Sequence, residues 1–572
     1  MTQWTGIPSE TQVLIVGGGP TGLLMSILLS QQGISNVVVE RKLTFQQSPA
    51  AHVVNARTFE ICRSAGIDME KIEAIAQNPA DGAWVRWSSA LGKGEVGKVP
   101  FEGQHHFEEL FATSPYPLRN LSQHQFEPLL GSYVQTLVHG AQWVSSVQDS
   151  DGVTSVIRNT QTNEETSIRS IYIIGCDGAR SAMRDSTSIT MDGPDELQSF
   201  VMIHATTDLR PVVGDSPATL YFITNPEIRS TFIAHDISKT WVLMKEWNSE
   251  TEPMESFTTQ KARETFCKAA GIAADYPLEI SNVGNWRMSC QIASKYSEGR
   301  IFVAGDAAHR FPPTGGLGLN TGAGDVHNLA WKMAFVLKGI ASEDLLETYE
   351  AERKPVADRN AQVSLENAFK LFEVWMALGV TDDVEESKAN EAQILSTQEG
   401  RDAVEAAVAN QAEHFDQLGL QLGYSYSADS GLTVDDGSEE ISSDNPVRNY
   451  VASLSPGARL PHMVIKKDNI DVALHDLVKP GHFLLISASD AWLKAAAEFS
   501  LPLTALHLGK EVVDTTGEFE SLAQIGDSGA LLVRPDQHVA FRTNSNDAPA
   551  ASLQKIFTTL KGFSRKIKNE NC

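Results

Sequence analysis

The motif Gly17-x-Gly19-x-x-Gly22 constrains the fold more than any other feature of this 572-residue chain. It follows an apolar run over residues 11–16 that is rich in β-branched residues and predicts a buried parallel strand. Apolar residues at helical spacing predict a helix after the motif, and residues 37–39 predict a second strand. A strand, a glycine turn, a helix and a second strand in this order predict a fold that receives a pyrophosphate at the turn.

An acidic residue, Glu40, closes the second predicted strand. A carboxylate at this position accepts hydrogen bonds from the ribose hydroxyls of a dinucleotide. The glycine motif alone is weak evidence, because glycine-rich turns also occur where nothing binds. Together with the strand, the helix and the acid, the motif indicates dinucleotide binding.

Two aspartates further along the chain each follow an apolar run. Asp177 comes directly after residues 173–176, a pattern that on its own also fits an ordinary turn at a strand end. Asp306 follows the run 301–304, and a glycine-rich loop then leads into a helix expected over residues 322–339. Open α/β sheets bind ligands at the carboxyl ends of their strands, so we expect Asp306 to face a ligand.

The charge and the cysteines limit the classes of function. The chain has 46 Lys and Arg against 72 Asp and Glu, a net charge of −26, and a field of that sign repels nucleic acids and anionic lipids. We therefore expect neither a nucleic-acid partner nor a membrane partner. The 5 cysteines form no C-x-x-C pair, which favours a reducing compartment and no metal site. Without a basic leader or an apolar stretch of about 18 residues, the protein is expected to be cytoplasmic.

The length predicts three or four domains. Short alternating runs over residues 219–247 predict antiparallel strands that form a separate layer. Acidic and small polar residues gather over residues 380–445, where we expect a helical excursion followed by a solvated loop. Apolar runs and a helical stretch over residues 457–543 predict a small α/β domain near the C-terminal end.

The motifs occur in the order, from Gln12 to about Arg353, that resembles the FAD-dependent aromatic hydroxylases, the single-component flavoprotein monooxygenases that include phenol hydroxylase and 4-hydroxybenzoate hydroxylase. The resemblance implies an α/β fold: a Rossmann-like FAD-binding domain of the 4-hydroxybenzoate hydroxylase type, an inserted antiparallel β-sheet substrate domain and a C-terminal thioredoxin-like domain. We place these parts at residues 1–188 and 286–380 for the FAD-binding domain with its long helices, 189–285 for the substrate domain, 381–445 for the helical excursion and acidic linker, and 446–565 for the C-terminal domain.

The resemblance also implies roles for individual residues. In the family, the glycine turn holds the FAD pyrophosphate, the position of Glu40 binds the adenosine ribose, and two backbone amides before a helix hold the flavin ring. The residues expected to bind FAD are Gly17, Gly19, Gly22, Glu40, Arg41, Gln123, Asp177, Asp306, Gly318, Leu319 and Asn320. The carbonyl of Pro313 is expected to face the substrate.

His52 is the candidate catalytic residue. It stands where phenol hydroxylase has an aspartate that contacts the phenol hydroxyl, and the 2-hydroxybiphenyl monooxygenase branch has a histidine there. A phenol with a pKa of about 10 is mostly neutral at pH 7, and histidine, with an ordinary pKa of about 6.5, suits the transfer of its proton. The alternative is a histidine that only packs near the flavin. His235 and Arg287 are further polar groups, for which we favour structural roles.

The expected function is hydroxylation of a phenolic or related aromatic substrate through a flavin hydroperoxide. FAD is the bound cofactor, NADH or NADPH the transient reductant and O₂ the cosubstrate, and the sequence does not choose between NADH and NADPH. The same scaffold could act on a polyketide, a pyridine or an antibiotic, or catalyse a Baeyer–Villiger or decarboxylative oxidation. A flavin-free dehydrogenase would leave Asp306 without a role, and a noncatalytic flavin-binding protein is a third alternative. The expected partner is a small aromatic substrate, and a homo-oligomer is left open.

Overall fold

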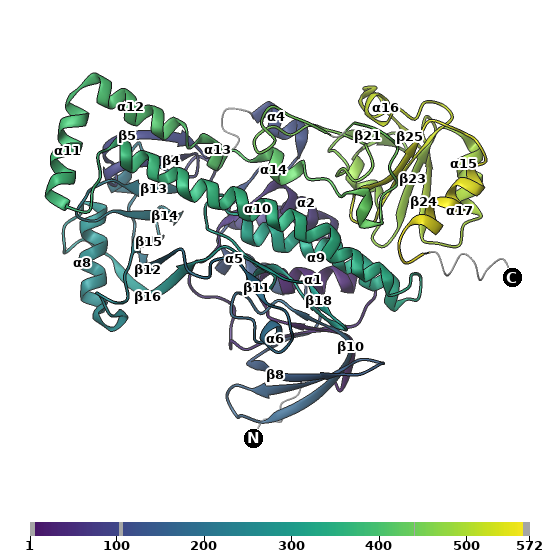
Figure 1. The fold of residues 1–572 in the computed structure, drawn as a ribbon, viewed down its shortest axis with the longest axis horizontal. Helices are drawn as coiled ribbons and strands as arrows, with labels where there is room; N and C mark the ends of the chain where they lie inside the picture. The colour runs from purple at the N-terminus through teal and green to yellow at the C-terminus, as the bar shows by residue number, and fades with distance from the viewer. Residues whose placement is uncertain (1–5, 102–106, 440, 564–572) are drawn as a thin grey trace.

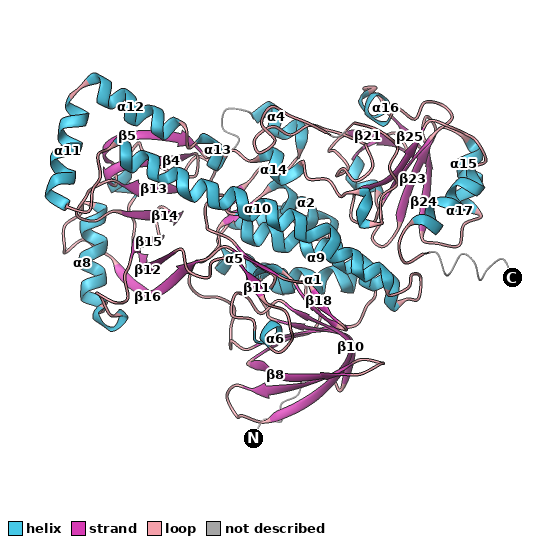
Figure 2. Ribbon diagram, in the orientation of Figure 1, coloured by secondary structure: helices cyan, strands magenta, loops and turns pink. Residues whose placement is uncertain are grey.

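The computed structural model describes residues 6–101, 107–439 and 441–563. It contains an eight-stranded sheet, a seven-stranded sheet and a C-terminal unit, and the long helix α10 (Asp344–Ala377) runs past all three (Figures 1 and 2). Leu345, Tyr349 and Val374 of this helix belong to three different hydrophobic cores. Cys572 and the last two residues of the expected C-terminal domain, 564–565, lie outside the described residues. No helix in the described ranges is both long and apolar enough to cross a membrane.

The eight-stranded sheet brings the three predicted motifs together at the carboxyl ends of its parallel strands. Strand β1 (Glu10–Val16) pairs in parallel with β2 (Asn36–Glu40) on one side and with β10 (Glu165–Gly175) on the other. Strand β19 (Ile301–Val303) pairs in parallel with β10. Because the carboxyl ends of parallel strands meet at the same edge, the residues after β1, β10 and β19 lie close together. The sheet is completed by β7 (Leu137–His139), β8 (Ala141–Gln148), β9 (Val153–Asn159) and β18 (Ser297–Glu298).

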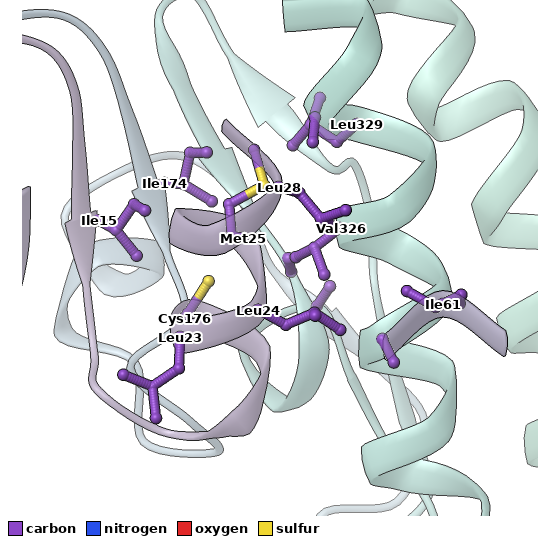
Figure 3. Packing of buried hydrophobic residues seen from close by; sticks show 14 of the residues in the cluster. Ile15, Leu23, Leu24, Met25, Leu28, Ile61, Ile174, Cys176, Val326 and Leu329 are labelled. Carbon is purple, nitrogen blue, oxygen red and sulfur yellow. The ribbon is translucent and has the colours of Figure 1, made fainter. Parts of the chain in front are cut away.

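Two helices pack against this sheet and against each other. Helix α1 (Pro20–Gln31) follows the glycine turn, and α9 (Leu317–Leu337) crosses it, so that Leu24 and Leu28 lie near Val326 and Leu329 (Figure 3). Helix α9 begins five residues before the position expected from the sequence. The reason is tertiary packing. A Cβ atom at Gly322 would lie 2.5 Å from the Thr21 hydroxyl oxygen, so this glycine allows α9 to approach α1 closely and is not a loop residue.

The seven-stranded sheet has the order β16-β12-β15-β14-β13-β4-β5. The three alternating runs predicted by the sequence form its centre, as β13 (Leu220–Ile223), β14 (Ser230–Asp236) and β15 (Thr240–Glu246), and these three pair antiparallel as expected. The sheet also contains β4 (Trp84–Ala90) and β5 (Lys93–Pro100), which lie outside the expected range 189–285. Strand β4 pairs with β13 in parallel, a long-range pairing that local patterns do not reveal. The other two strands are β12 (Gln198–Thr206) and β16 (Glu279–Met288).

Each face of the seven-stranded sheet has its own core. Helix α8 (Thr259–Ala270) covers the face that carries Phe232 and Trp241. The other face carries Trp87 and Phe222, which stack at 4.9 Å between ring centroids, and it packs against α10 and α12 (Gln398–Ala409). The remaining helices of the excursion are α11 (Val384–Ser396), α13 (Ala412–Phe415) and α14 (Leu418–Leu422).

The C-terminal unit contains a four-stranded sheet of order β24-β23-β26-β27, formed by Phe483–Ser487 (β23), Leu503–His507 (β24), Ala530–Val533 (β26) and Val539–Thr543 (β27). Helices α15 (Asp490–Ala497) and α17 (Pro549–Thr559) lie beside it. Trp331 and Phe335 of α9 share a core with Phe483 and Phe557. The unit is therefore anchored by apolar contacts to the helix that also packs against α1, next to the glycine turn.

Candidate active site

The glycine turn after β1 has the geometry that a phosphate-binding turn requires. Gly17 has φ = 111°, and a Cβ atom there would lie 2.2 Å from the carbonyl oxygen of Cys176. A Cβ atom at Gly22 would lie 2.0 Å from the carbonyl oxygen of Gly17. At Gly19, in contrast, no described atom lies within 4 Å of the ideal Cβ position. Gly17 and Gly22 are therefore required by the fold, whereas Gly19 leaves room for a ligand beside the backbone.

Glu40 lies beside this turn at the end of β2. Its carboxylate accepts hydrogen bonds from the backbone amides of Gly18, at 2.7 Å, and Lys42, at 2.8 Å. These two amides hold the carboxylate next to the turn, where the ribose of a dinucleotide is expected. Arg41 follows directly and has an exposed side chain.

Gln123 begins helix α5 (Gln123–Gly131) and connects it to the segment before His52. Its backbone amide donates to the carbonyl of Ala51 at 2.8 Å, and its side-chain oxygen accepts from the amide of Ala51 at 3.3 Å. Its side-chain nitrogen donates to Glu127 at 2.6 Å. Gln123 thus fixes the backbone beside His52, while its role toward a cofactor stays a prediction.

Asp177 has an oxygen atom left over for a ligand. Its Oδ2 accepts a hydrogen bond from the amide of Met183 at 3.1 Å. Its Oδ1 is buried and has no hydrogen-bond partner among the described residues. Burial raises the pKa of this carboxyl. A buried oxygen without a partner is costly, and a hydroxyl group of a bound cofactor would satisfy it.

Asp306 lies at the uncapped N-terminus of α9. The Cβ position of Gly318, in the first turn of α9, lies 3.8 Å from Asp306 Oδ1, and no side chain caps this helix end. The carboxyl is accessible to solvent, yet the protein around it removes enough water to raise its pKa. The free amides of Gly318 and Leu319 provide a positive helix end beside it.

The buried carboxylate of Asp325 holds the Asp306 turn in place. It accepts hydrogen bonds from the amide of Gly305 at 3.1 Å, from His309 at 2.7 Å and from Arg353 at 3.0 Å. All three contacts are buried. The sequence alone does not indicate Asp325, because its partners Gly305, His309 and Arg353 come from three separate elements.

Asn320 joins the start of α9 to helix α2 (Ala56–Ser64). Its side-chain oxygen accepts from the amide of Asn55 at 3.0 Å and from the hydroxyl of Thr58 at 2.8 Å. Its side-chain nitrogen donates to the carbonyl of Val53 at 3.0 Å. Pro313 lies just before this helix with an exposed ring, and its carbonyl accepts from the amide of Gly316 at 3.0 Å.

His52 lies next to this helix start in one definite hydrogen-bonded form. Its Nδ1 is 3.0 Å from the side-chain oxygen of Asn120. The amide nitrogen of Asn120 donates to Gln77 at 2.6 Å and to the carbonyl of Ala234 at 2.8 Å, which fixes the orientation of the amide. His52 must therefore carry its proton on Nδ1, and Nε2 is left as an acceptor. Burial lowers the pKa of His52 to about 4, so the ring is neutral at pH 7.

The structure brings His235 to His52. The two rings meet edge to face at 5.1 Å between centroids, and neither nitrogen of His235 has a hydrogen-bond partner among the described residues. Sequence reasoning favoured a structural role for His235. A signal was available: Phe232 and Ala234 face the α8 side of the sheet, so an alternating strand turns His235 to the other face, toward His52. Arg287 is about half exposed and forms ion pairs with Asp195 and Glu196, away from this group.

These features fit a bound dinucleotide: an open backbone at Gly19, a held acid at Glu40, an unpartnered oxygen at Asp177 and an uncapped helix beside Asp306. The glycine turn and Glu40 would hold the pyrophosphate and ribose of FAD, and the α9 end would hold the flavin.

Comparisons with known proteins agree with this arrangement. Residues 10–364 match the FAD binding domain family, and residues 453–562 match the family described as aromatic-ring hydroxylase, C-terminal. The chain is 30% identical to 2,4-dichlorophenol 6-monooxygenase of Delftia acidovorans, over 96% of this chain and 98% of that protein. It is also 30% identical to a putative polyketide hydroxylase of Streptomyces halstedii, over 96% of both.

Among solved structures, the chain is similar to the flavin-dependent monooxygenase PieE in complex with FAD and substrate. The TM-score is 0.89 at 31% identity, and the match covers 96% of this chain and 99% of that chain. The site geometry and the full-length matches together show that the chain belongs to the FAD-dependent aromatic hydroxylases and is a flavin monooxygenase that uses FAD.

Proposed function

We propose that this enzyme is an NAD(P)H- and O₂-dependent monooxygenase that hydroxylates a phenolic ring next to its hydroxyl group. The observation that carries the proposal is the neutral His52, whose Nδ1 proton is committed to Asn120 and whose Nε2 is free to accept. One relative is named for a dichlorophenol, and a phenolic hydroxyl is a group that such an acceptor recognises.

The position of His52 supports this role. The carbonyl of Val53, the next residue, accepts a hydrogen bond from the Asn320 side chain, and the Val53 side chain packs against Gly316 at the start of α9. Val53 also packs against the core that contains Trp87 and Phe222. An aromatic ring bound here would have His52 at one edge, an apolar wall on one side and the FAD region on the other.

In the proposed mechanism, Nε2 of His52 accepts the hydrogen bond of the substrate hydroxyl and takes its proton as the ring is attacked. Loss of this proton raises the electron density of the ring at the neighbouring carbon. FAD, when bound, supplies the redox chemistry that activates O₂. The apolar residues of the sheet face exclude water, and the Asn120 amide keeps the imidazole in the accepting tautomer.

We also propose roles for the predicted FAD-binding residues and for the C-terminal unit. The FAD-binding residues are those named from the family resemblance, with Asp177 and Asp306 as acceptors for cofactor hydroxyls. The C-terminal unit has a thioredoxin-like arrangement and a structural role, because no cysteine occurs between residues 446 and 565 to support thiol chemistry.

The test compares His52→Ala with His482→Ala, a histidine of the C-terminal unit, in NAD(P)H oxidation assays with a panel of phenols and aromatic polyketides. We expect His52→Ala to retain bound FAD and NAD(P)H oxidation but to lose hydroxylated product by about 10²- to 10⁴-fold, with peroxide formed instead. His482→Ala should behave as the parent enzyme. Unchanged product yield in His52→Ala would refute the role of His52, and stimulation by polyketides alone would refute the phenol assignment.

A further inference from the structure

A polar cavity lies where α2, α9 and α10 meet α14 and the residues that follow it. Its polar lining includes Arg57, Arg353, Asn55, Asn320, Asn360 and Tyr424. Two of these side chains are cations, and none of the described residues that line the cavity is acidic. The protein as a whole has a net charge of −26, so a cavity lined by two guanidinium groups is a local exception.

Arg57 has an unused donor in this cavity. Its guanidinium group donates to Glu60 at 3.1 Å, to the Gln537 side chain at 3.0 Å and to the carbonyl of Asp536 at 3.1 Å. Only 4% of the residue is exposed, and its buried Nε has no hydrogen-bond partner among the described residues. An unpaired donor on a buried cation is costly unless a ligand or water accepts from it.

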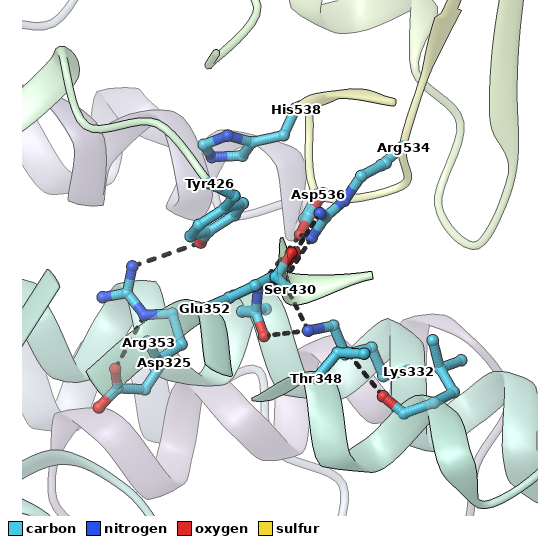
Figure 4. Close-up of polar contacts among 12 residues, drawn as sticks. Asp325, Lys332, Thr348, Glu352, Arg353, Tyr426, Ser430, Arg534, Asp536 and His538 are labelled. Carbon is cyan, nitrogen blue, oxygen red and sulfur yellow. Dashed lines mark hydrogen bonds and ion pairs between the residues drawn. The ribbon is translucent and has the colours of Figure 1, made fainter. Parts of the chain in front are cut away.

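The buried charges around the cavity do not balance. Arg353 forms an ion pair with Asp325, while Glu352 accepts hydrogen bonds from Lys332 at 2.6 Å and from Arg534 at 2.8 Å (Figure 4). Across this connected network, the buried cations outnumber the buried carboxylates by five to four: Arg57, Lys332, Arg353, Arg459 and Arg534 against Glu60, Asp325, Glu352 and Asp536. Aromatic faces lie over three of these cations: Trp331 and Tyr426 at 5.6 Å and 5.0 Å from the Arg534 guanidinium, Tyr424 at 5.4 Å from Arg353 and Tyr450 at 5.4 Å from Arg459. Arg57 interacts with Glu60 and Tyr424, but its Nε is left without an acceptor among the described residues.

We propose that this cavity binds one small monovalent anion, such as a halide, between Arg57 and Arg353. The anion would accept from Nε of Arg57 and would balance the fifth buried cation. Asn320 and Asn55 both line the cavity and hydrogen-bond to each other, and this bond joins α2 to the start of α9. Filling the cavity would therefore stabilise the junction between α2 and the start of α9. The anion would act on the stability of the protein and not on substrate binding.

The first measurement is the melting temperature of the holoenzyme in chloride-free buffer, titrated with sodium chloride at constant ionic strength. Sodium gluconate makes up the balance, because its anion is too large for the cavity. We expect the melting temperature to rise by about 1 °C for each tenfold increase in chloride above its dissociation constant. Equal melting temperatures in chloride and gluconate would overturn the proposal.

Two variants place the effect in this cavity. Asn360→Asp supplies a carboxylate of the same shape, and we expect it to abolish the chloride dependence while keeping the protein as stable in gluconate as the parent is in chloride. Arg63→Gln is the matched control, since Arg63 lies on the same helix and pairs with Asp476 of the C-terminal unit at 2.7 Å, but lies outside the cavity. It should keep the chloride dependence. A chloride effect that survives Asn360→Asp, or that disappears in Arg63→Gln, contradicts the proposal.

Crystals grown with bromide locate the anion directly. We expect an anomalous bromine peak within hydrogen-bond distance of Arg57 Nε. A water molecule there in place of bromide would overturn the proposal. Bromide in the crystal without a chloride effect in solution would show binding at crystal concentration only, and it would also overturn the proposal.

Discussion

At the scale of single residues, two glycines of one motif have different physical roles. In Gly22→Ala the new Cβ would lie 2.0 Å from the Gly17 carbonyl, so the turn must distort, and we expect a lower melting temperature of the apoprotein. In Gly19→Ala the Cβ meets no atom and the residue has φ = −78°, which alanine tolerates. We expect an unchanged apoprotein that binds FAD at least about tenfold more weakly, measured by fluorescence titration.

Each of these two variants is the control for the other. Equal loss of apoprotein stability in the two variants would mean that Gly19 serves the fold and not the cofactor. Equal FAD affinity of Gly19→Ala and the parent would exclude a close approach of the pyrophosphate to that backbone.

Asn120 provides a prediction about pH. The pKa of His52 is about 4 because burial disfavours its charged form, and the proposed mechanism requires the neutral ring, so kcat/KM should fall only as the pH approaches 4. In Asn120→Asp a carboxylate beside Nδ1 favours the charged ring and raises the pKa of His52, so the acidic limb of the profile should move to higher pH. Asn120→Leu is the control, because it loses the same donated hydrogen bonds without adding a charge. An acidic limb at the same pH in both variants would contradict the assignment.

The sequence predicts the role of a residue best where that residue acts through its near neighbours in the chain. Gly17, Gly22 and Glu40 act within one strand–turn–helix unit, and their spacing alone indicates their role. Asn120 and His235 act through contacts with residues 68 and more than 180 positions away from them, and only the assembled structure reveals the pair that they form with His52.

At the scale of elements, the start of α9 depends on Asp325 within the same helix. Asp325→Asn would remove the charge that balances Arg353 and weaken the hold on Gly305, so we expect a loss of about 3–5 kcal/mol in the free energy of unfolding and weaker FAD binding. Urea unfolding and FAD titration measure the two effects. The exposed Asp402 of α12 is the matched control, and Asp402→Asn should change stability by less than about 0.5 kcal/mol. Similar stability of the two variants would show that Asp325 is not required.

The elements themselves were predicted where periodicity or alternation is strong. The strands β1, β13, β14 and β15 appear where the patterns indicate them. The start of α9 was expected too late, because glycine usually disfavours helices and its use for packing against α1 is a tertiary effect. The strands β4 and β5 were missed as members of the second sheet, since their partner β13 follows more than 100 residues later.

At the scale of the whole molecule, buried histidines make the protein sensitive to acid. Burial lowers the pKa of four histidines, His327, His414, His475 and His538, from 6.5 to about 3. Below pH 6.5 the unfolded chain therefore binds more protons than the folded one, and stability falls as the pH drops toward 3. Each fully buried histidine contributes a slope of up to about 1.4 kcal/mol per pH unit.

Urea unfolding at several pH values between 7.5 and 5 measures this slope. His327→Gln should reduce it by the contribution of one group, because glutamine does not titrate. A midpoint that does not change between pH 7.5 and 5 would show that these rings are protonated or exposed in the folded protein.

The parallel pairing of β4 with β13 has a consequence for the synthesis of the chain. The hairpin of β4 and β5 leaves the ribosome about 130 residues before β13, which at 5–20 residues per second is a delay of about 7–26 s. During this interval the inward-facing Val85 and Trp87 lack their sheet, and the edge of β4 is open to any extended segment nearby. The nascent enzyme thus passes through a stage in which chaperone binding and aggregation compete for the same strand edge.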